Sequence, residues 1–342
     1  MHLSHYTDFN LFYSPFLTYS IFSFLFFHKS SDTRWGRAQE VMSECPKLTG
    51  DLVFAYVTGL QNNTETLTPT SPPILTVACC KHYAVYNTET IPTDRHHFNA
   101  VVTARDLWEI YLPVFEQCIN KAKGQSIMCS YNEVNGVPAC ANGGLITDIA
   151  RGAFSFDGFV MSDYDAWQEM VTTHAWAANW TVAAVAGLSA GLDQEGGGGP
   201  IYEPVQIGIP DAVITGQITL SNLTIPVRRL MRARLRLGMF DPPASVAYNY
   251  LSLLDVASPD KVALAEKAAR AGLTLLKNTN NALPLLLNTG VYHKIALVGP
   301  NANSSYGLLG SYSDPYCCGV GIPSILQEFS YRVAGAGVDF SY

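Results

Sequence analysis

Short apolar runs alternate along the chain with longer segments whose apolar residues follow helical spacing. Three runs rich in β-formers predict buried strands: ILTVACC at 74–80, QSIMCSY at 125–131 and GFVMSD at 158–163. Residues 103–123 carry apolar side chains along one helical face, and Thr103 is the predicted N-cap. Strands and helices that alternate at spacings of roughly 30 to 50 residues are typical of a parallel α/β sheet or barrel.

Helical spacing predicts several further helices. They lie at 47–60, up to about 153, from Asp165 onward, at 211–237, after Ser258-Pro259 and near 323–329. Pro113 is expected to kink the helix at 103–123, because proline lacks the N–H that the preceding turn requires. A further buried strand, KIALVG, is predicted at 294–299.

Breaks in these patterns divide the chain into four parts. An aromatic segment at 1–32 precedes an α/β domain at 33–240, and the sequence GMFDPP ends that domain and leads into a linker at 241–257. A second α/β unit follows at 258–342. Its elements are too few to close a sheet layer, so we expect it to be the beginning of a larger domain.

The amino-terminal residues 8–27, DFNLFYSPFLTYSIFSFLFF, are almost uncharged and strongly aromatic. Their length and composition are compatible with a short membrane span, with the apolar part of a signal peptide, or with a core strand region. Pro15 interrupts the segment, no Lys or Arg precedes it, and no small-residue cleavage site follows. These features weaken both targeting interpretations.

The composition argues against one class of partner. The 342 residues carry a formal net charge of −7, which disfavours nucleic acid as a ligand. Only 14% of the residues are charged, while the chain holds 18 Tyr and 16 Phe, a balance that fits neutral polar ligands bound on aromatic surfaces. Aromatic residues are, however, more often simply part of a protein core.

The eight cysteines lack the paired CxxC spacing of a zinc site, so we predict no metal and no cofactor. Four sequons would permit N-glycosylation and favour a secreted or extracellular protein; they begin at Asn62, Asn179, Asn222 and Asn303. In an oxidising compartment Cys129 and Cys140 are a possible disulfide, although sequence alone leaves the connectivity open.

Two other motifs point to no ligand. The glycines at 196–199 lack the Lys-Ser/Thr ending and the strand-to-helix context of a phosphate-binding loop. The arginines in VRRLMRARLRL, at 227–237, suit the carboxyl end of a helix, where cations complement the helix dipole. We predict a solvated helix face there and not a binding patch.

Asp163 is the first candidate for a catalytic residue. It ends the apolar run at 158–163, and in parallel α/β folds the carboxyl ends of strands face the ligand. The alternative is a helix N-cap, because Asp and Ser commonly close the first turn after a strand. The predicted strand at 74–80 likewise ends in ionisable residues, Lys81 and His82.

Eight ordered motifs then resemble glycoside hydrolase family 3, and most of all its β-xylosidase branch. They are TRWGRAQE, ACCKHYAVYN, IMCSYNEVNGVPAC, GFVMSDYDAW, AGLD, RLRLGMFDPP, LTLLKNTNNALPL and IALVGPNAN, and they cover roughly residues 33–342. The resemblance implies a partial (β/α)8 TIM-like barrel at 33–240, followed by the start of an α/β sandwich domain at 258–342. It also implies hydrolysis with retention of anomeric configuration.

The resemblance assigns a role to each matching residue. Asp163 corresponds to the nucleophile that forms the glycosyl-enzyme intermediate. The residues that correspond to the sugar-binding subsite are Arg37, Lys81 and His82, with Met128 and Tyr131 as its wall. A cation near Asp163 is expected to keep the carboxylate ionised.

The implied function is an exo-acting retaining glycoside hydrolase that removes β-linked xylose from xylo-oligosaccharides or xylan ends. The alternatives are an α-L-arabinofuranosidase or β-glucosidase of the same family, or a non-catalytic incomplete homologue. Where the family has GQETPGEDP, this chain has AQEVMSECP at 38–46, and its first strands and acid/base glutamate have no match here. We therefore expect residues 1–342 alone to hydrolyse unactivated xylobiose poorly.

Overall fold

The computed structural model describes residues 23–26, 34–62, 71–90, 93–197, 203–256, 258–308 and 322–342. The chain divides between Asn249 and Tyr250 into two compact units. This division falls inside the segment 241–257, for which the sequence predicted a linker. Each unit is described by itself below.

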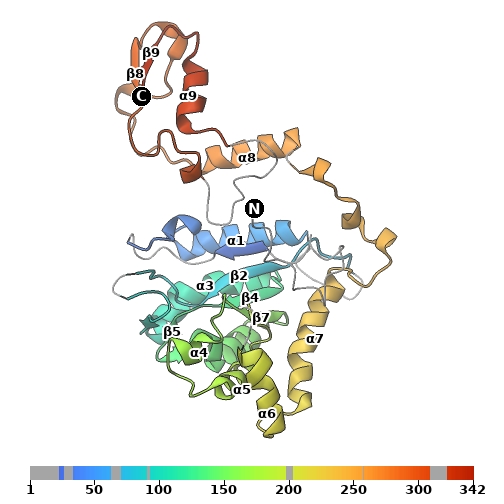
Figure 1. Ribbon diagram of the computed structural model, residues 1–342. Coiled ribbons are helices and arrows are strands. Elements are labelled where there is room, and N and C mark those ends of the chain that lie inside the picture. The colour runs from blue at the N-terminus through green and yellow to red at the C-terminus, as the bar shows by residue number, and fades with distance from the viewer. Residues whose placement is uncertain are drawn as a thin grey trace, which may run out of the picture. The chain divides into compact units, whose positions relative to one another are not determined.

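A parallel sheet forms the centre of the first unit (Figure 1). Its strands, in spatial order, are β1 (Ser23–Phe26), β2 (Ala78–Tyr83), β4 (Ser126–Cys129) and β7 (Phe159–Ser162). The register places Lys81 opposite Met128, and Met128 opposite Met161. The three strands predicted in the first half of the chain are therefore confirmed as parallel neighbours.

Strand β2 begins later than the sequence predicted, at Ala78 and not at residue 74. The N–H of Ile74 donates to the Arg236 carbonyl at 2.9 Å, and the N–H of Leu75 donates to the Gln61 carbonyl at 2.9 Å. Because these N–H groups are already bonded outside the sheet, pairing starts only after them. Lys81 consequently lies inside the strand and not beyond its end.

The helix predicted at 103–123 is present as one helical run from Ala104 to Lys121. It consists of α2 (Ala104–Asp106), a π-helical turn at Leu107–Tyr111, α3 (Leu112–Glu116) and a second π-helical turn at Gln117–Lys121. The Thr103 hydroxyl accepts the Asp106 N–H at 3.1 Å, which confirms the predicted cap. A wide turn directly before Pro113 accommodates its missing N–H.

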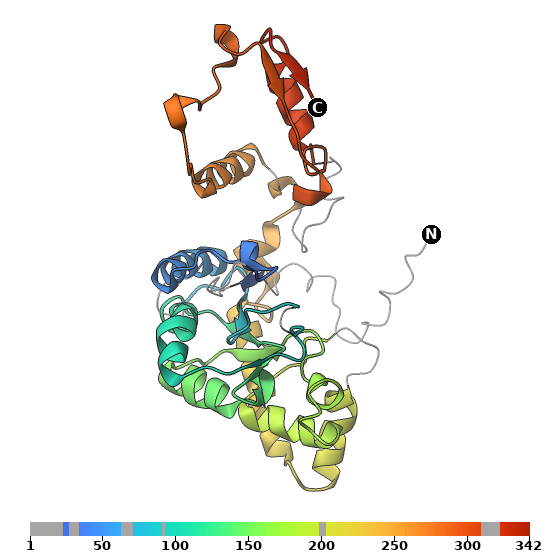
Figure 2. The ribbon, with the colours of Figure 1, turned by 90° about the vertical axis from the view of Figure 1, so that its left-hand side faces the viewer.

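Helices cover one face of the sheet, as Figure 2 shows. They are α1 (Pro46–Gln61), α3 and the π-helical segment Gly144–Ala153. Their apolar side chains, such as Val53, Phe115 and Ile146, are buried in one core with the outward-facing strand residues Ile127 and Val160. The sequence predicted helices in all three of these segments, and the apolar side chains that they share with this core are the reason they form.

The opposite face of the sheet packs against α7 (Leu220–Arg236). Alternate strand residues Cys79, Met128 and Met161 point to this side and form a second core with Ala233 and Leu237. Period-two alternation of the strand side chains thus separates the two cores.

The single helix predicted at 211–237 is interrupted. The structure has α6 (Ile209–Ile214) and then α7, because Gly216 adopts a left-handed φ of 72° and ends the first helix. Thr219 and Asn222 form a reciprocal capping box that starts α7.

The helix predicted from Asp165 also starts late. Asp165 has a left-handed φ of 61°, and α4 (Glu169–Thr172) begins four residues further on. Helix α5 (Trp180–Ala190) follows and is capped by Asn179. Gly187 lets it approach the Trp167 ring, since a Cβ there would lie 2.6 Å from the indole.

The remaining elements of the first unit are short. Strands β3 (Asn99–Ala100), β5 (Glu133–Val134) and β6 (Val137–Pro138) form a small second sheet. Helical turns lie at Ala38–Glu40, Ala139–Ala141, Pro204–Gly208, Pro243–Ser245 and Ala247–Tyr250, the last crossing the unit boundary.

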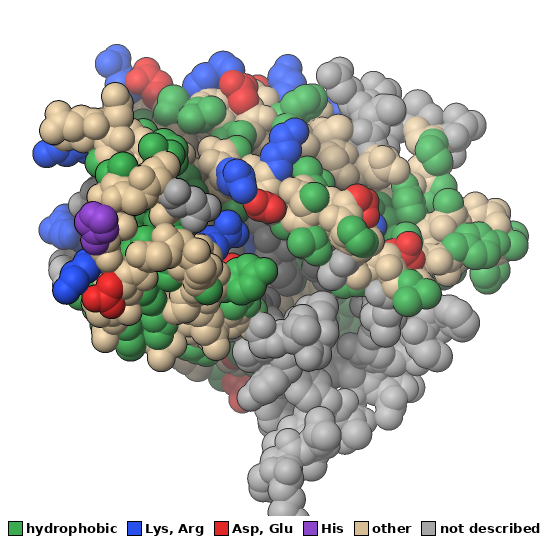
Figure 3. Space-filling view, turned by 90° about the horizontal axis from the view of Figure 1, so that it is seen from above, with side chains coloured by type: hydrophobic (Ala, Val, Ile, Leu, Met, Phe, Trp, Pro, Cys, Tyr) green, Lys and Arg blue, Asp and Glu red, His purple; other side chains and the backbone are tan. Residues whose placement is uncertain are grey.

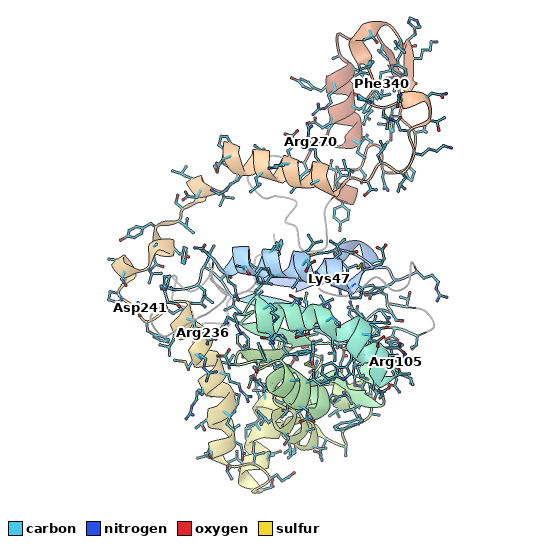
Figure 4. All side chains as sticks on the ribbon, turned by 180° about the vertical axis from the view of Figure 1, so that it is seen from behind. Lys47, Arg105, Arg236, Asp241, Arg270 and Phe340 are labelled. Atoms are coloured by element: carbon cyan, nitrogen blue, oxygen red, sulfur yellow. A yellow bond between two sulfur atoms is a disulfide. The ribbon has the colours of Figure 1, made fainter. Side chains whose placement is uncertain are left out.

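The second unit contains α8 (Pro259–Gly272), α9 (Ile325–Val333) and the parallel strands β8 (Lys294–Ala296) and β9 (Asp339–Ser341). Short helical turns lie at Leu253–Asp255, Thr279–Asn281, Leu287–Thr289 and Tyr306–Leu308. Phe329 of α9 stacks on Phe340 of β9, which Figure 4 labels, with ring centroids 5.6 Å apart.

The strand predicted at 294–299 is present as β8, but the prediction that it is buried is wrong. Lys294 and Ala296 are exposed, and pairing ends at Ala296. Among the described residues β8 pairs with β9 alone, so this two-stranded sheet leaves much of the apolar surface of the unit uncovered. Leu276 and Val298, for example, are 92% and 84% exposed. Hydrophobic side chains reach the surface between charges of both signs in Figure 3.

The aromatic segment at 8–27 is described only at its end. Residues 23–26 form β1 and pair with β2, which supports the core-strand interpretation for those four residues. The rest of that segment lies outside the described residues. No helix within the described part of the chain is long and apolar enough to cross a membrane. The α/β class is confirmed, while closure into a barrel stays a prediction.

Candidate active site

Asp163 follows directly after β7, and its side chain is buried with only 8% of the residue exposed. Its N–H donates to the Cys129 carbonyl at 3.0 Å, and its Oδ1 accepts the Tyr164 N–H at 2.8 Å. The alternative role as a helix cap is wrong, because α4 begins at Glu169 and its N-cap is Gln168. The carboxylate is therefore held at the carboxyl end of the sheet.

His82 and Lys81 bring basic groups to the same end. The His82 Nε2 lies 3.2 Å from the Asp163 Oδ2, and the His82 ring packs edge-on against Tyr86 with centroids 5.0 Å apart. His82 and Lys81 are 1% and 2% exposed. Strands β7 and β2, which lie on either side of β4, thus supply the acid and the two bases from segments about 80 residues apart in sequence.

Tyr131 is buried beside Asp163, and Met128 is buried in the core shared with α7, so their role as the wall of a sugar site stays a prediction. Tyr131 lies between two basic side chains. The Arg95 guanidinium is 4.9 Å from the centroid of the Tyr131 ring, and the His96 ring is 4.4 Å from it. These contacts fix the phenol ring beside the carboxylate.

Arg37 is held by acidic residues. Its Nε and Nη2 donate to the two Glu40 oxygens at 3.0 Å each, and its Nη1 donates to the Tyr86 hydroxyl at 3.4 Å. Burial lowers the pKa of Arg37, but Glu40 and Tyr86 outweigh it and raise the pKa above its ordinary value. The divergent segment 38–46 therefore begins with a partner for Arg37, and Tyr86 links Arg37 to His82.

Charge and burial act in opposite directions on Asp163. Burial raises the pKa of Asp163 above its ordinary value of 3.8. The Tyr164 N–H and the positive charges of Lys81, Arg37 and Arg95 lower it, but not by enough to compensate. The expected cations are present, yet the net effect is a carboxylate that ionises less readily than a free one.

Several residues at this end were missed by sequence reasoning. Glu89 accepts the Trp35 indole N–H at 3.2 Å and lies 3.7 Å from Arg95, while His96 Nδ1 lies 2.7 Å from Glu169 Oε1. The hydrogen bond with Glu169 raises the pKa of His96. The run DRHH at 94–97, in a loop that follows a strand, was the available signal.

The predicted bridge between Cys129 and Cys140 is confirmed, and it ties the end of β4 to the loop that follows Tyr131. A second disulfide joins Cys80 of β2 to Cys118. Disulfides are typical of secretory compartments, although the localisation itself stays a prediction. Among the described residues, no group of three or more His, Cys, Asp or Glu side chains is placed to hold a metal ion.

The profile of the glycosyl hydrolase family 3 N terminal domain matches residues 29–233. The chain belongs to glycosyl hydrolase family 3. The family resemblance of the sequence motifs is thereby confirmed, and the match contains every residue discussed above for this site. The individual catalytic and binding roles stay predictions.

Relatives of this family 3 chain carry xylosidase names. It is 36% identical over 292 residues to the probable beta-D-xylosidase 7 of Arabidopsis thaliana, covering 84% of this chain and 37% of that relative. It is 34% identical over 288 residues to the beta-xylosidase/alpha-L-arabinofuranosidase 1 of Medicago sativa subsp. varia, covering 84% and 36%.

A solved structure is similar as well. It is a family 3 exo-beta-xylosidase in complex with a xylobiose aziridine activity-based probe, with a TM-score of 0.80 and 30% sequence identity. The similarity covers 94% of this chain and 39% of that one. The chain thus spans less than two fifths of the length of the proteins it resembles.

Proposed function

We propose that this protein is an exo-acting retaining glycoside hydrolase that removes β-linked xylose from the ends of xylo-oligosaccharides or xylan. One observation carries the proposal: the buried Asp163 carboxylate lies at a strand end with His82 at 3.2 Å. Such a carboxylate is costly to bury, and its position serves no cap.

The fold inferred for this site is a (β/α)8-like barrel. Support comes from the parallel order β1–β2–β4–β7, with the candidate residues gathered at the carboxyl ends of three strands. Barrel enzymes of this class build their sites at that end.

Asp163 is the proposed nucleophile. Oδ1 is bonded to the Tyr164 N–H, and Oδ2, which lies 3.2 Å from His82 Nε2, is the oxygen that attacks the anomeric carbon as the bond to the leaving oxygen breaks. The product is a glycosyl ester, which water then hydrolyses with a second inversion, so the configuration is retained. The Tyr164 N–H and the nearby cations stabilise the carboxylate that is regenerated.

The neighbouring side chains suit a neutral sugar. Lys81 and His82 offer donors for hydroxyl groups, while Met128 and Tyr131 give an apolar wall against which a sugar ring packs. Xylose is favoured because both relatives carry β-xylosidase names. The name of the Medicago relative also supports α-L-arabinofuranosidase activity as the second candidate.

Aryl glycosides with activated leaving groups give the direct test. These groups depart without a proton, so they examine the attacking carboxylate by itself. We expect turnover of dinitrophenyl β-xyloside above that of the α-L-arabinofuranoside and the β-glucoside, with β-xylose as the first-formed product in proton NMR. First-formed α-xylose would contradict a retaining nucleophile.

Replacing Lys81 by Met is expected to move the acidic limb of the pH profile to higher pH. Lys81 lowers the pKa of Asp163, and the nucleophile acts only when ionised, so removing the cation delays ionisation. Initial rates on the activated xyloside between pH 3 and 8 give the pH at which this acidic limb lies.

The matched control for this change is Lys47→Met. Lys47, labelled in Figure 4, lies on α1, and its side chain is 80% exposed beside Asp51. An acidic limb that is the same in Lys81→Met as in Lys47→Met would show that Lys81 does not act on the nucleophile.

A further inference from the structure

A buried hydroxyl with three close neighbours lies next to the proposed nucleophile. The Ser162 Oγ is 2.8 Å from the Asp163 carbonyl oxygen, 2.5 Å from the Glu195 Oε1 and 2.8 Å from the Gly196 nitrogen. Ser162 itself is 0% exposed. The Gly196 N–H donates to the hydroxyl, and the other two neighbours are oxygens.

The number of protons decides how these contacts are satisfied. A serine hydroxyl has one proton and so donates to one oxygen only. If it donates to the Asp163 carbonyl, an ionised Glu195 is left facing an oxygen at 2.5 Å with no proton between them. If it donates to ionised Glu195, the Asp163 carbonyl keeps only the Ala166 N–H, at 3.0 Å. All contacts are satisfied when Glu195 is a carboxylic acid that donates to Ser162.

We propose that Glu195 is a positioning residue for Asp163: as a neutral acid it donates to Ser162, which then donates to the Asp163 carbonyl and fixes the turn that aims the nucleophile. Ionisation of Glu195 reverses the hydroxyl and releases that carbonyl. The inference deepens the proposed function, on which it rests for the role of Asp163.

The surroundings of Glu195 disfavour its charged form. Burial raises the pKa of Glu195 to about 7, and the charge of Asp165 adds to this effect. Asp163 is a further carboxylate in the same turn, and Asp193, two residues before Glu195, is already paired with two arginines. Hydrogen bonds from Ser162, the Gly196 N–H and the Trp167 N–H oppose the shift without cancelling it.

The second oxygen of Glu195 gives an independent indication. Within the described residues Oε2 is buried and has no hydrogen-bond partner. Glu195 lines a cavity of about 630 Å³ whose walls are mainly apolar, among them Met161, Trp167 and Leu230. An oxygen without a donor is less costly to bury in a neutral acid than in a carboxylate, so the state of Oε2 favours the protonated form.

The backbone conformation at Gly196 permits the close contact between the 195–196 segment and Ser162. A Cβ on Gly196 would lie 2.2 Å from the Ser162 carbonyl oxygen, so only glycine lets the 195–196 segment approach the strand this closely. The approach places the Gly196 N–H on the Ser162 hydroxyl at 2.8 Å.

Covalent labelling by 2-deoxy-2-fluoro-β-xylosyl fluoride tests the inference. Asp163 attacks the anomeric carbon and fluoride leaves without a proton, so no separate acid shapes the pH profile. For the unaltered chain we expect the labelling rate to rise as Asp163 ionises and then to fall about tenfold around pH 7, as one hydrogen bond is lost. Glu195→Gln, whose amide donates at every pH, should rise in the same way and not fall. Glu195→Ala should label slowly throughout.

Glu109→Gln is the matched control, because it makes the same chemical change at an exposed helical position. It should keep the descending limb near pH 7. A descending limb retained in Glu195→Gln would overturn the inference.

Thermal unfolding without ligand separates this inference from the proposed function. Because Glu195 keeps its proton in the folded state to about pH 7, and an unfolded Glu loses it near 4.5, stability should decline between these values. The Tm of Glu195→Gln minus that of the unaltered chain should therefore grow across this window. A constant difference would overturn the inference, whereas absence of label on Asp163 with a growing difference would overturn only the nucleophile.

Discussion

Asp163→Asn is expected to lower turnover of an activated aryl xyloside by on the order of 10⁴-fold or more. The amide keeps the shape of the side chain and its bond from the Tyr164 N–H, but it does not form the glycosyl ester. Because burial raises the pKa of Asp163, the charged form is costly in the fold, and the neutral amide should leave the Tm no lower than before.

Azide distinguishes loss of the nucleophile from a damaged site. In Asp163→Gly the space left by the carboxylate should admit azide, which attacks the anomeric carbon as the phenolate departs and gives a xylosyl azide of inverted configuration. The matched control is Asp211→Asn, an exposed carboxylate, which should keep full turnover. Turnover in Asp163→Asn equal to that of the control would exclude Asp163 as the nucleophile.

Asp193→Ala is expected to cost about 3 to 5 kcal/mol of unfolding free energy, because it breaks a buried ion-pair network and leaves two partly buried arginines without their partner. The Asp193 carboxylate is 0% exposed and contacts Arg151 at 2.6 Å and Arg229 at 2.8 Å. It also accepts the Val160 N–H at 2.8 Å. Urea unfolding followed by circular dichroism measures the loss.

Asp157 provides the matched control. It pairs with Arg236, labelled in Figure 4, at 2.7 Å and with Arg232 at 3.6 Å, but its side chain is 53% exposed. Exposed pairs contribute only about 0 to 1 kcal/mol, so Asp157→Ala should be nearly neutral. Equal losses of unfolding free energy in Asp193→Ala and Asp157→Ala would mean that the burial of Asp193 does not determine how much its ion pairs stabilise the fold. The predicted solvated arginine face on α7 is confirmed for Arg228 and Arg234, whereas Arg229, Arg232 and Arg236 pair with acids of the same unit.

The local sequence was sufficient to predict the helices and strands that are specified by residues close together in the chain. Thr103 capping a long apolar face predicted the helical run, and apolar runs of β-formers predicted β4 and β7 to within two residues. Element boundaries failed where a distant group intervened. Ile74 bonds to the Arg236 carbonyl, more than 150 residues away, and no local pattern reports such a bond.

The candidate site likewise contains residues that the local sequence predicted and residues that it did not. The strand-end position of Asp163 and the motifs that resemble family 3 were readable in the chain, and they brought Lys81 and His82 with them. The contacts of Glu89 with Trp35 and of Glu169 with His96 were not, because they join segments that only folding brings together. Glu40 lies only three residues from Arg37, and its pairing was missed although it is local.

Asp163 and Asp193 show what the sequence determined and what only the tertiary structure decided. Each acid follows an apolar run, so the sequence marked both as carboxylates at the end of buried segments. In the fold, Asp163 faces His82, whereas Asp193 is enclosed by Arg151 and Arg229. The partners of a carboxylate set its chemistry, and they lie far away along the chain: His82 is on strand β2, about 80 residues from Asp163, and the two arginines are on helical segments about 40 residues from Asp193.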